Sequence, residues 1–111
     1  MRLVYLESPY AGAIEENIAY ARKCVGDCLR RGEAPFVSHL LYTQPNVLDD
    51  TIPSERKLGM EAGFAWAQKA EATVVYTDYG ISKGMEEGIR RAEREGRKVE
   101  YRIILGKATD D

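Results

Sequence analysis

The sequence predicts an α/β domain in which a parallel sheet of about four strands carries helices on both faces. Short apolar or β-branched runs alternate with segments whose apolar residues recur every three or four positions. The most continuous apolar run, residues 72–77, is typical of a strand buried on both faces, as in parallel sheets. The chain of 111 residues is long enough for one domain with a sizeable core.

The first half of the chain holds two strands and a long helix. Residues 3–6 form a short apolar strand that ends at Ser8-Pro9-Tyr10. Residues 13–31 form a helix, because apolar side chains recur at helical spacing and Gly32 is a natural stop. Residues 34–41 are apolar and β-branched and predict a second strand, with a proline at its edge.

The second half continues the alternation. It holds a polar loop at 43–51, a helix from Pro53 to about Lys69, a strand at 72–77, a helix from Ser82 to near Gly96 and a strand at 99–105. Pro53 suits a first helical turn, and Ser82 can cap the helix that follows it. This order predicts a Rossmann-like or flavodoxin-like three-layer domain over residues 1–106, followed by a frayed polar tail at 107–111.

Composition excludes several classes of function. The net charge of −2 leaves no basic stripe for duplex nucleic acid, so no duplex nucleic-acid partner is expected. No apolar run approaches the roughly 20 residues of a membrane span, and the first residues lack a signal-peptide pattern, so we expect a cytoplasmic protein. Cys24 and Cys28, four apart in a helix, predict reduced packing residues, because a disulfide there would be strained.

Three predicted loops lie where open parallel sheets bind ligands, beyond the carboxyl ends of the strands. They cover residues 7–12, 38–44 and 78–84. In the first loop, Tyr10 offers a flat face and a hydroxyl for a base or a sugar; alternatively, it only covers the core. In the second, His39 is the one histidine of the chain, and it is either functional or a hydrogen-bonded structural residue. No metal is expected there, because no Cys or His lies at ligand spacing.

The third loop carries the strongest local signal. Asp78 follows a strand, where a carboxylate can accept hydrogen bonds from ribose hydroxyls. Gly84 exposes backbone N–H groups at a helix start, where the helix dipole favours a phosphate, and Ser82 can donate to the same anion. The alternative is an ordinary capped helix with Asp78 as a solvated loop residue.

Together these loops resemble the nucleoside 2-deoxyribosyltransferase-like superfamily, which includes nucleotide N-glycosidases and many small phage and bacterial proteins. The resemblance spans nearly the whole chain. Its markers are Ser8-Pro9-Tyr10 after the opening strand, Asn17 in the first helix, Pro35 to His39, and Ser82-Lys83-Gly84-Met85 after the strand at 73–77. It implies a Rossmann-like sheet, dimers or larger oligomers, and a nucleoside or nucleotide bound at these loops, with no cofactor. The implied substrate-binding residues are Ser8, Pro9, Tyr10, Asn17, His39, Asp78, Ser82, Gly84 and Met85.

The resemblance also implies a catalytic glutamate that attacks the C1′ carbon of the sugar, usually through a glycosyl-enzyme intermediate. Its position in this chain is occupied by Gly88. Glu86 and Glu87 are adjacent, but a helix turns about 100° per residue, so neither points the same way. Glu7 and Asp78 remain as the candidate catalytic carboxylates.

Two classes of function follow. The first is a nucleotide- or nucleoside-binding protein which, if active, is an N-glycosidic bond hydrolase or a deoxyribosyltransferase. Because Gly88 replaces the nucleophile, we expect turnover of ordinary deoxynucleoside monophosphates to be absent or very slow. The alternative is a noncatalytic sensor or sequestering protein for a nucleotide-type signal. A flavodoxin-like redox carrier is disfavoured, since no Ser/Thr-rich phosphate loop follows the first strand.

The helix at 53–69 is apolar over more than one face. We expect Leu58, Ala62 and Ala65 on one side, with Phe64 or Trp66 turned elsewhere. This excess of apolar surface predicts a homodimer or a larger homo-oligomer. A helix wedged deep inside one domain would show the same pattern.

Overall fold

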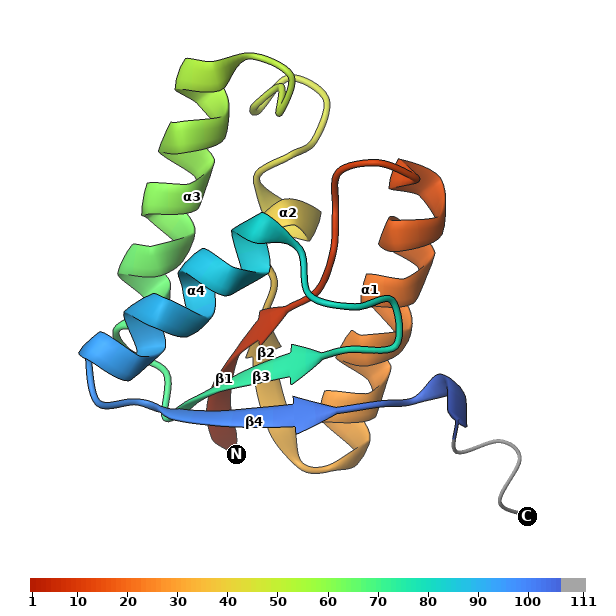
Figure 1. The fold of residues 1–111 in the computed structure, drawn as a ribbon, viewed down its shortest axis with the longest axis vertical. Helices are drawn as coiled ribbons and strands as arrows, with labels where there is room; N and C mark the ends of the chain where they lie inside the picture. The colour runs from red at the N-terminus through yellow and green to blue at the C-terminus, as the bar shows by residue number, and fades with distance from the viewer. Residues whose placement is uncertain (107–111) are drawn as a thin grey trace.

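Four parallel strands form the central sheet, in the order β2-β1-β3-β4 (Figure 1). The computed structural model describes residues 1–106, so the tail predicted at 107–111 lies outside the described residues. The strands are β1 (Arg2–Glu7), β2 (Glu33–Phe36), β3 (Ala72–Tyr76) and β4 (Lys98–Arg102). The helices are α1 (Ile14–Arg30), α2 (Ser38–Leu41), α3 (Pro53–Ala67) and α4 (Lys83–Arg94). The predicted α/β class is confirmed.

The helices cover both faces of the sheet, because side chains alternate along each strand. On one face, Val4 and Leu6 of β1 pack with Tyr20, Cys24 and Cys28 of α1. On the other face, α3 and α4 cover β1 and β3 through two further apolar clusters. All five residues of β3 are buried, which confirms the prediction of a strand covered on both sides. Both cysteines are free and buried.

The chain after β2 differs from the prediction. The strand ends at Phe36 rather than at 41, and residues 38–41 form the short helix α2. Val37 and Leu40 lie three apart and both pack on the α1 side of the core, so the apolar run also satisfies helical spacing. A hydrogen bond from the backbone N–H of Tyr42 to the carbonyl of Ser38 closes the turn. This turn places His39 at the carboxyl end of the sheet.

The last strand is also shorter than predicted, and it ends at Arg102 rather than at 105. The backbone N–H groups of Ile104 and Leu105 donate to the carboxylate of Asp78 instead of continuing the pairing with β3. Within residues 1–106, no helix is long and apolar enough to cross a membrane.

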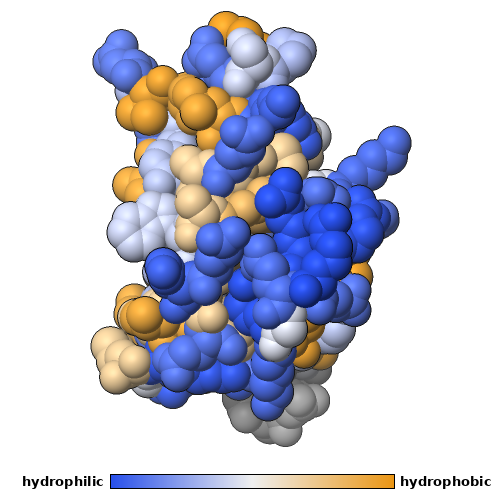
Figure 2. Space-filling model, turned by 90° about the vertical axis from the view of Figure 1, so that its left-hand side faces the viewer, coloured by the Kyte–Doolittle hydropathy of each residue, from blue (hydrophilic) through white to orange (hydrophobic). Residues whose placement is uncertain are grey.

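The orientation of α3 decides which of the predicted apolar faces is buried. Phe64 is buried against Tyr5 and Ala67, whereas Leu58 and Trp66 are exposed. Gly63 explains this orientation, because a Cβ there would lie 2.7 Å from Tyr5 Oη and 2.8 Å from the Cβ of Ser38. The helix therefore approaches the sheet along its Gly63 side. Figure 2, which views the molecule from the α3 side, shows hydrophobic surface interrupted by hydrophilic side chains.

The strand order reverses between β1 and β3. The chain leaves β1 toward β2 through α1, and it leaves β3 toward β4 through α4 on the opposite face (Figure 1). In open α/β sheets such a reversal opens a crevice at the carboxyl ends of the two central strands. We therefore expect a ligand site beside the residues that follow β1 and β3.

Candidate functional site

A cavity of about 320 Å³ opens at the carboxyl end of the sheet. This volume falls at the lower end of the roughly 300–1,000 Å³ that small-molecule sites occupy. Its walls come from the end of β1, from α2 and the loop after it, from one face of α3 and from the start of α4. Among the lining residues are Tyr5, Glu7, Ser8, Tyr10, Ser38, His39, Tyr42, Arg56, Met60, Phe64, Ser82, Lys83, Gly84 and Met85.

Glu7 ends β1 and belongs to this cavity. It is 9 % exposed, and its Oε2 atom has no hydrogen-bond partner among residues 1–106. Burial raises the pKa of this carboxyl group to about 8, against a small opposing effect of the Arg97 charge. At neutral pH the group is therefore mostly protonated, and it can donate a hydrogen bond as well as accept one.

The carboxyl group of Glu7 lies against Gly88 of α4. A Cβ atom at position 88 would overlap Glu7 Oε2, so the missing side chain makes room for this carboxyl group. Gly88 is the position where the resemblance implies a glutamate. In this chain, the Glu7 carboxyl group from β1 fills the space where a side chain at position 88 of α4 would begin.

Ser8, Tyr10 and His39 form the neighbouring wall. Ser8 Oγ lies 3.1 Å from His39 Nε2, and the Tyr10 ring lies 5.3 Å from the imidazole. Burial lowers the pKa of His39 to about 4, so the ring is neutral at pH 7. Its Nδ1 atom is buried and has no partner among the described residues. The single histidine is thus a neutral polar group beside the cavity.

Positive groups gather where α4 begins. Ser82 caps the helix by accepting a hydrogen bond from the backbone N–H of Met85 at 3.3 Å, as predicted for a capped helix. The guanidinium of Arg56 approaches the same turn, since its Nη2 lies 3.9 Å from the place where Gly84 would carry a Cβ. Lys83 lines the cavity as well. A helix start with a nearby guanidinium is an arrangement that binds anions.

The carboxylate of Asp50 partly offsets the positive charge at the start of α4. Asp50 lies at the same mouth of the cavity and pairs with Arg56, with Oδ2 at 3.3 Å from Nη1. Both partners are partly exposed, so the pair is weak and Arg56 can turn toward an incoming anion. The site therefore suits a ligand that carries a modest negative charge.

Three of the predicted binding residues lie outside this cavity. The Nδ2 of Asn17 donates to the backbone carbonyls of Tyr10 and Ala11 at 2.9 and 3.1 Å, which fixes the loop after β1. Pro9 and Asn17 line a shallow neighbouring depression instead. The residues that the structure does bring together at the cavity are Ser8, Tyr10, His39, Ser82, Gly84 and Met85, with Glu7.

Asp78 is the third predicted residue that lies away from the cavity lining. Its carboxylate accepts hydrogen bonds from the Tyr20 hydroxyl and from the backbone N–H groups of Ile104 and Leu105. Burial alone would raise the pKa of Asp78, but these hydrogen bonds outweigh it and lower the pKa. Asp78 thus ties the chain after β4 to the loop after β3. Of the two candidate catalytic carboxylates, only Glu7 faces the cavity.

Sequence reasoning missed the contribution of α3. Arg56, Met60 and Phe64 line the cavity at spacing of four, so they share one face of the helix. This periodicity is visible in the sequence, but only the packing of α3 over β1 shows which face is turned to the site. Within residues 1–106, no group of three or more His, Cys, Asp and Glu side chains is placed to hold a metal ion.

Comparison with known proteins places this architecture in a family. The model of a family described as "Domain of unknown function (DUF7768)" matches residues 2–102. The chain belongs to this family. No curated protein matches the DUF7768 chain.

A solved structure shares the fold of the DUF7768 chain. It is a 2-deoxyribosyltransferase from the psychrotolerant bacterium Bacillus psychrosaccharolyticus, described as a biocatalyst for the synthesis of nucleosides. The superposition gives a TM-score of 0.62 and covers 97% of this chain and 80% of that chain, at 17% sequence identity. At this identity the likeness shows the fold, which agrees with the Rossmann-like domain that the sequence predicts.

Proposed function

We propose that this chain binds a nucleoside or a nucleoside monophosphate in the cavity between β1, α2, α3 and α4. One observation carries this proposal: a single cavity joins an aromatic wall, a buried neutral carboxyl group and a positively charged helix start. An aromatic wall suits a base, a carboxyl group can hydrogen-bond the hydroxyls of a sugar, and a positively charged helix start suits a phosphate. The fold shared with a 2-deoxyribosyltransferase supports a nucleoside over other small phosphate compounds.

The three parts of the ligand are assigned by chemistry. The phosphate lies at the start of α4, where it accepts hydrogen bonds from backbone N–H groups near Gly84 and from Arg56. The base lies against the rings of Tyr10 and Phe64, because both side chains line the cavity and offer apolar faces. The sugar then lies between them, beside Glu7. A triphosphate fits less well, since Asp50 opposes additional negative charge at the mouth.

Calorimetric titration tests this proposal, with a panel of nucleosides, their 5′-monophosphates, their 5′-triphosphates, ribose 5-phosphate and inorganic phosphate. At least one nucleoside or monophosphate should bind saturably and more tightly than ribose 5-phosphate. Arg56→Gln should weaken the binding of the monophosphate at least fivefold. Lys57→Gln, a neighbouring change outside the cavity lining, should leave this binding unchanged. If no nucleoside compound in the panel binds, or if Arg56→Gln has no effect on any of them, the proposal fails.

Gly88 favours a second candidate function, a noncatalytic sensor or sequestering protein for a nucleotide-type signal. A protein of this kind needs the same cavity but no group that reacts with the sugar. It would bind the ligand and return it unchanged. Chromatography of the ligand after incubation with the protein separates the two candidates, since only an N-glycosidase or a deoxyribosyltransferase releases the free base.

A further inference from the structure

Glu7 is the one buried carboxyl group of the cavity whose interactions within the folded chain do not explain its presence. Desolvation opposes its charged form, and Oε2 has no hydrogen-bond partner among residues 1–106. Placing such a group in a core is unfavourable, and groups of this kind cluster at functional sites, where they act on a bound molecule. By contrast, the buried carboxylate of Glu33 is satisfied by two hydrogen bonds of 2.7 Å from Arg102.

We propose that Glu7 is the reacting carboxyl group of the cavity and donates a proton to the departing base when an N-glycosidic bond is cleaved. This inference rests on the proposed nucleoside site. It assigns to β1 a role that the resemblance places on α4, and it reverses the expectation of absent or very slow turnover, which rested on Gly88 alone.

The position of Glu7 supports this role. It ends a central strand at the reversal of strand order, and its side chain lies between Gly88 and the cavity. Strand β1 pairs with β2 as far as Tyr5, and Glu7 itself pairs with Val75 of β3, so the sheet holds the backbone that carries Glu7. A carboxyl group on a rigid strand is better placed for a directed proton transfer than one on an exposed loop.

The surroundings of Glu7 keep the group protonated at neutral pH. Tyr5 of β1 and Arg97 before β4 interact electrostatically with Glu7, and the cavity that Glu7 lines also holds His39 of α2, Arg56 of α3 and Lys83 of α4. Arg97 favours the charged form, but its guanidinium is engaged by Thr73 and Glu95. Burial outweighs this effect, so Glu7 enters the reaction as an acid.

The reaction step balances with water as the only co-reactant. As the bond between C1′ and the base nitrogen breaks, the bonding electron pair goes to the base, and the base takes the proton of Glu7. Water then adds to C1′ and loses a proton to the Glu7 carboxylate. One water is consumed for each base released, and Glu7 regains its starting form.

The contact with Gly88 provides a structural test of the same inference. Gly88→Glu alone should lower the midpoint of thermal unfolding, because its Cβ overlaps the Glu7 carboxyl group. Adding Glu7→Ala removes the overlap and should restore the midpoint. The double variant then presents a carboxyl group from α4, and it should recover part of the activity that Glu7→Ala loses.

The decisive experiment follows base release by chromatography and binding by calorimetry, on the full chain with nucleosides and their 5′-monophosphates. Wild-type protein should release base, with a rate that falls above pH 8. Glu7→Gln should lower this rate at least about 100-fold, the usual lower contribution of a general acid, and should change the dissociation constant less than threefold. Glu7→Asp keeps a carboxylic acid, so its rate of base release should lie between those of wild type and Glu7→Gln. Glu93→Gln, an exposed change on α4, should release base at the wild-type rate.

The outcomes separate the two proposals. Protein that binds a nucleoside but releases no base, or a Glu7→Gln variant that releases base at the wild-type rate, would overturn the role of Glu7 and leave the binding site standing. Absence of any nucleoside binding would overturn the proposed function itself.

Discussion

Glu7 and Gly88 lie on different elements, β1 and α4, and the side chain of one occupies the space that the other leaves empty. Each residue is visible in the sequence, and Glu7 was a candidate for that reason. Their contact is not visible, because it depends on how α4 packs over the end of β1. The resemblance implies a glutamate where this chain has Gly88, and only the structure shows that the Glu7 carboxyl group lies against this glycine.

The raised pKa of Glu7 predicts a pH dependence of stability. The pKa is about 8 in the folded chain against an ordinary 4.5, so between these values the folded chain holds a proton that the unfolded chain has released. The free energy of unfolding therefore falls as the pH rises through this window, by up to about 1.4 kcal/mol per pH unit. Because the pKa of His39 is lowered to about 4, its titration makes the free energy of unfolding rise with pH between about pH 4 and 6.5. The loss of stability caused by Glu7 therefore shows most clearly above pH 6.5.

Urea unfolding of wild type and Glu7→Gln between pH 5 and 9 measures this effect. The glutamine cannot ionise, so the stability of the variant relative to wild type should rise as the pH increases toward 8. A constant difference between the two proteins across this range would show that Glu7 titrates as an ordinary exposed carboxyl group.

At the scale of elements, the proposed phosphate site lies at the start of α4. Ser82 both caps this helix and lines the cavity, and Gly84 leaves open space toward Arg56. The sequence predicted the cap at Ser82, because a cap depends on neighbouring residues, and the phosphate site at Gly84 stays a prediction. It did not predict α2 or the inward face of α3, since a four-residue turn and the choice of a helix face are decided by tertiary packing.

Changing this turn should separate the phosphate from the rest of the ligand. Ser82→Ala removes a cap and should cost about 1 kcal/mol of stability. Gly84→Val places methyl groups in the space beside Arg56. The double variant should bind a nucleoside 5′-monophosphate at least tenfold more weakly than wild type, and its binding of the parent nucleoside should weaken much less. Calorimetry on both ligands measures the two effects. Equal weakening of both, in a folded double variant, would move the phosphate to another part of the cavity.

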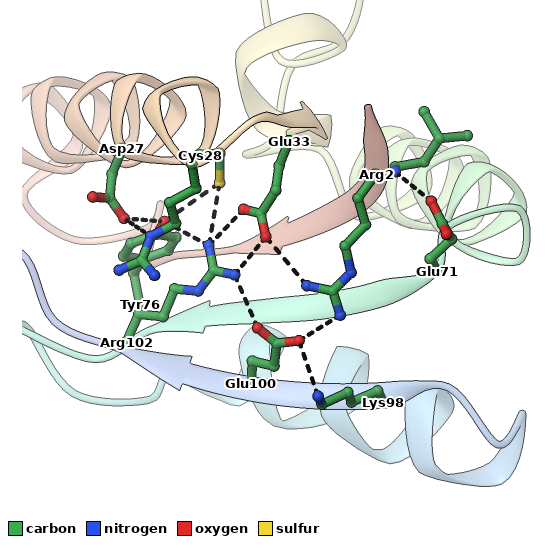
Figure 3. A network of polar contacts seen from close by, with 11 residues as sticks. Arg2, Asp27, Cys28, Glu33, Glu71, Tyr76, Lys98, Glu100 and Arg102 are labelled. Carbon is green, nitrogen blue, oxygen red and sulfur yellow. Dashed lines mark hydrogen bonds and ion pairs between the residues drawn. The ribbon is translucent and has the colours of Figure 1, made fainter.

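At the scale of the whole molecule, one polar network ties all four strands to α1 (Figure 3). Arg102 of β4 donates to both oxygens of Glu33 on β2 and to the Tyr76 hydroxyl on β3. Arg2 of β1 joins Glu33 to Glu100, and the Tyr76 hydroxyl donates to Asp27 of α1. The alternation of strands and helices predicted the layers, but this network depends on the strand order and register, which the local sequence does not specify.

Removing Arg102 should test how far the network holds the sheet. The Glu33 and Arg102 side chains are 7% and 6% exposed, and the hydrogen bonds from Arg102 lower the pKa of Glu33. Arg102→Met leaves that carboxylate buried with only Arg2, so stability should fall by about 3–5 kcal/mol, as for other broken buried pairs. Urea unfolding measures this loss, with Arg90→Met, an exposed change on α4, as the control. A loss below about 1 kcal/mol would show that the network is dispensable.

The predicted homo-oligomer also belongs to the whole molecule. Leu41, Leu58 and Trp66 of α2 and α3 are each more than half exposed. Trp66 also stacks on Phe36, with ring centroids 5.4 Å apart, so its position is held in place. We expect a dimer or a larger oligomer that buries this surface, and Leu58→Glu should shift it toward monomer. Light scattering that gives 12.5 kDa for wild type at micromolar concentration would contradict this prediction.

The most direct test of the nucleoside site is a nuclear magnetic resonance titration of the ¹⁵N-labelled chain with the best-binding nucleoside 5′-monophosphate. The account predicts saturable shifts of the backbone amides that follow β1, of α2 and of the first turn of α4, around Ser8, His39 and Gly84. Amides beside the network of Figure 3, such as those of Glu33 and Glu100, should keep their positions. Saturable shifts that map to another surface, or no saturable shift with any nucleoside compound, would contradict the account.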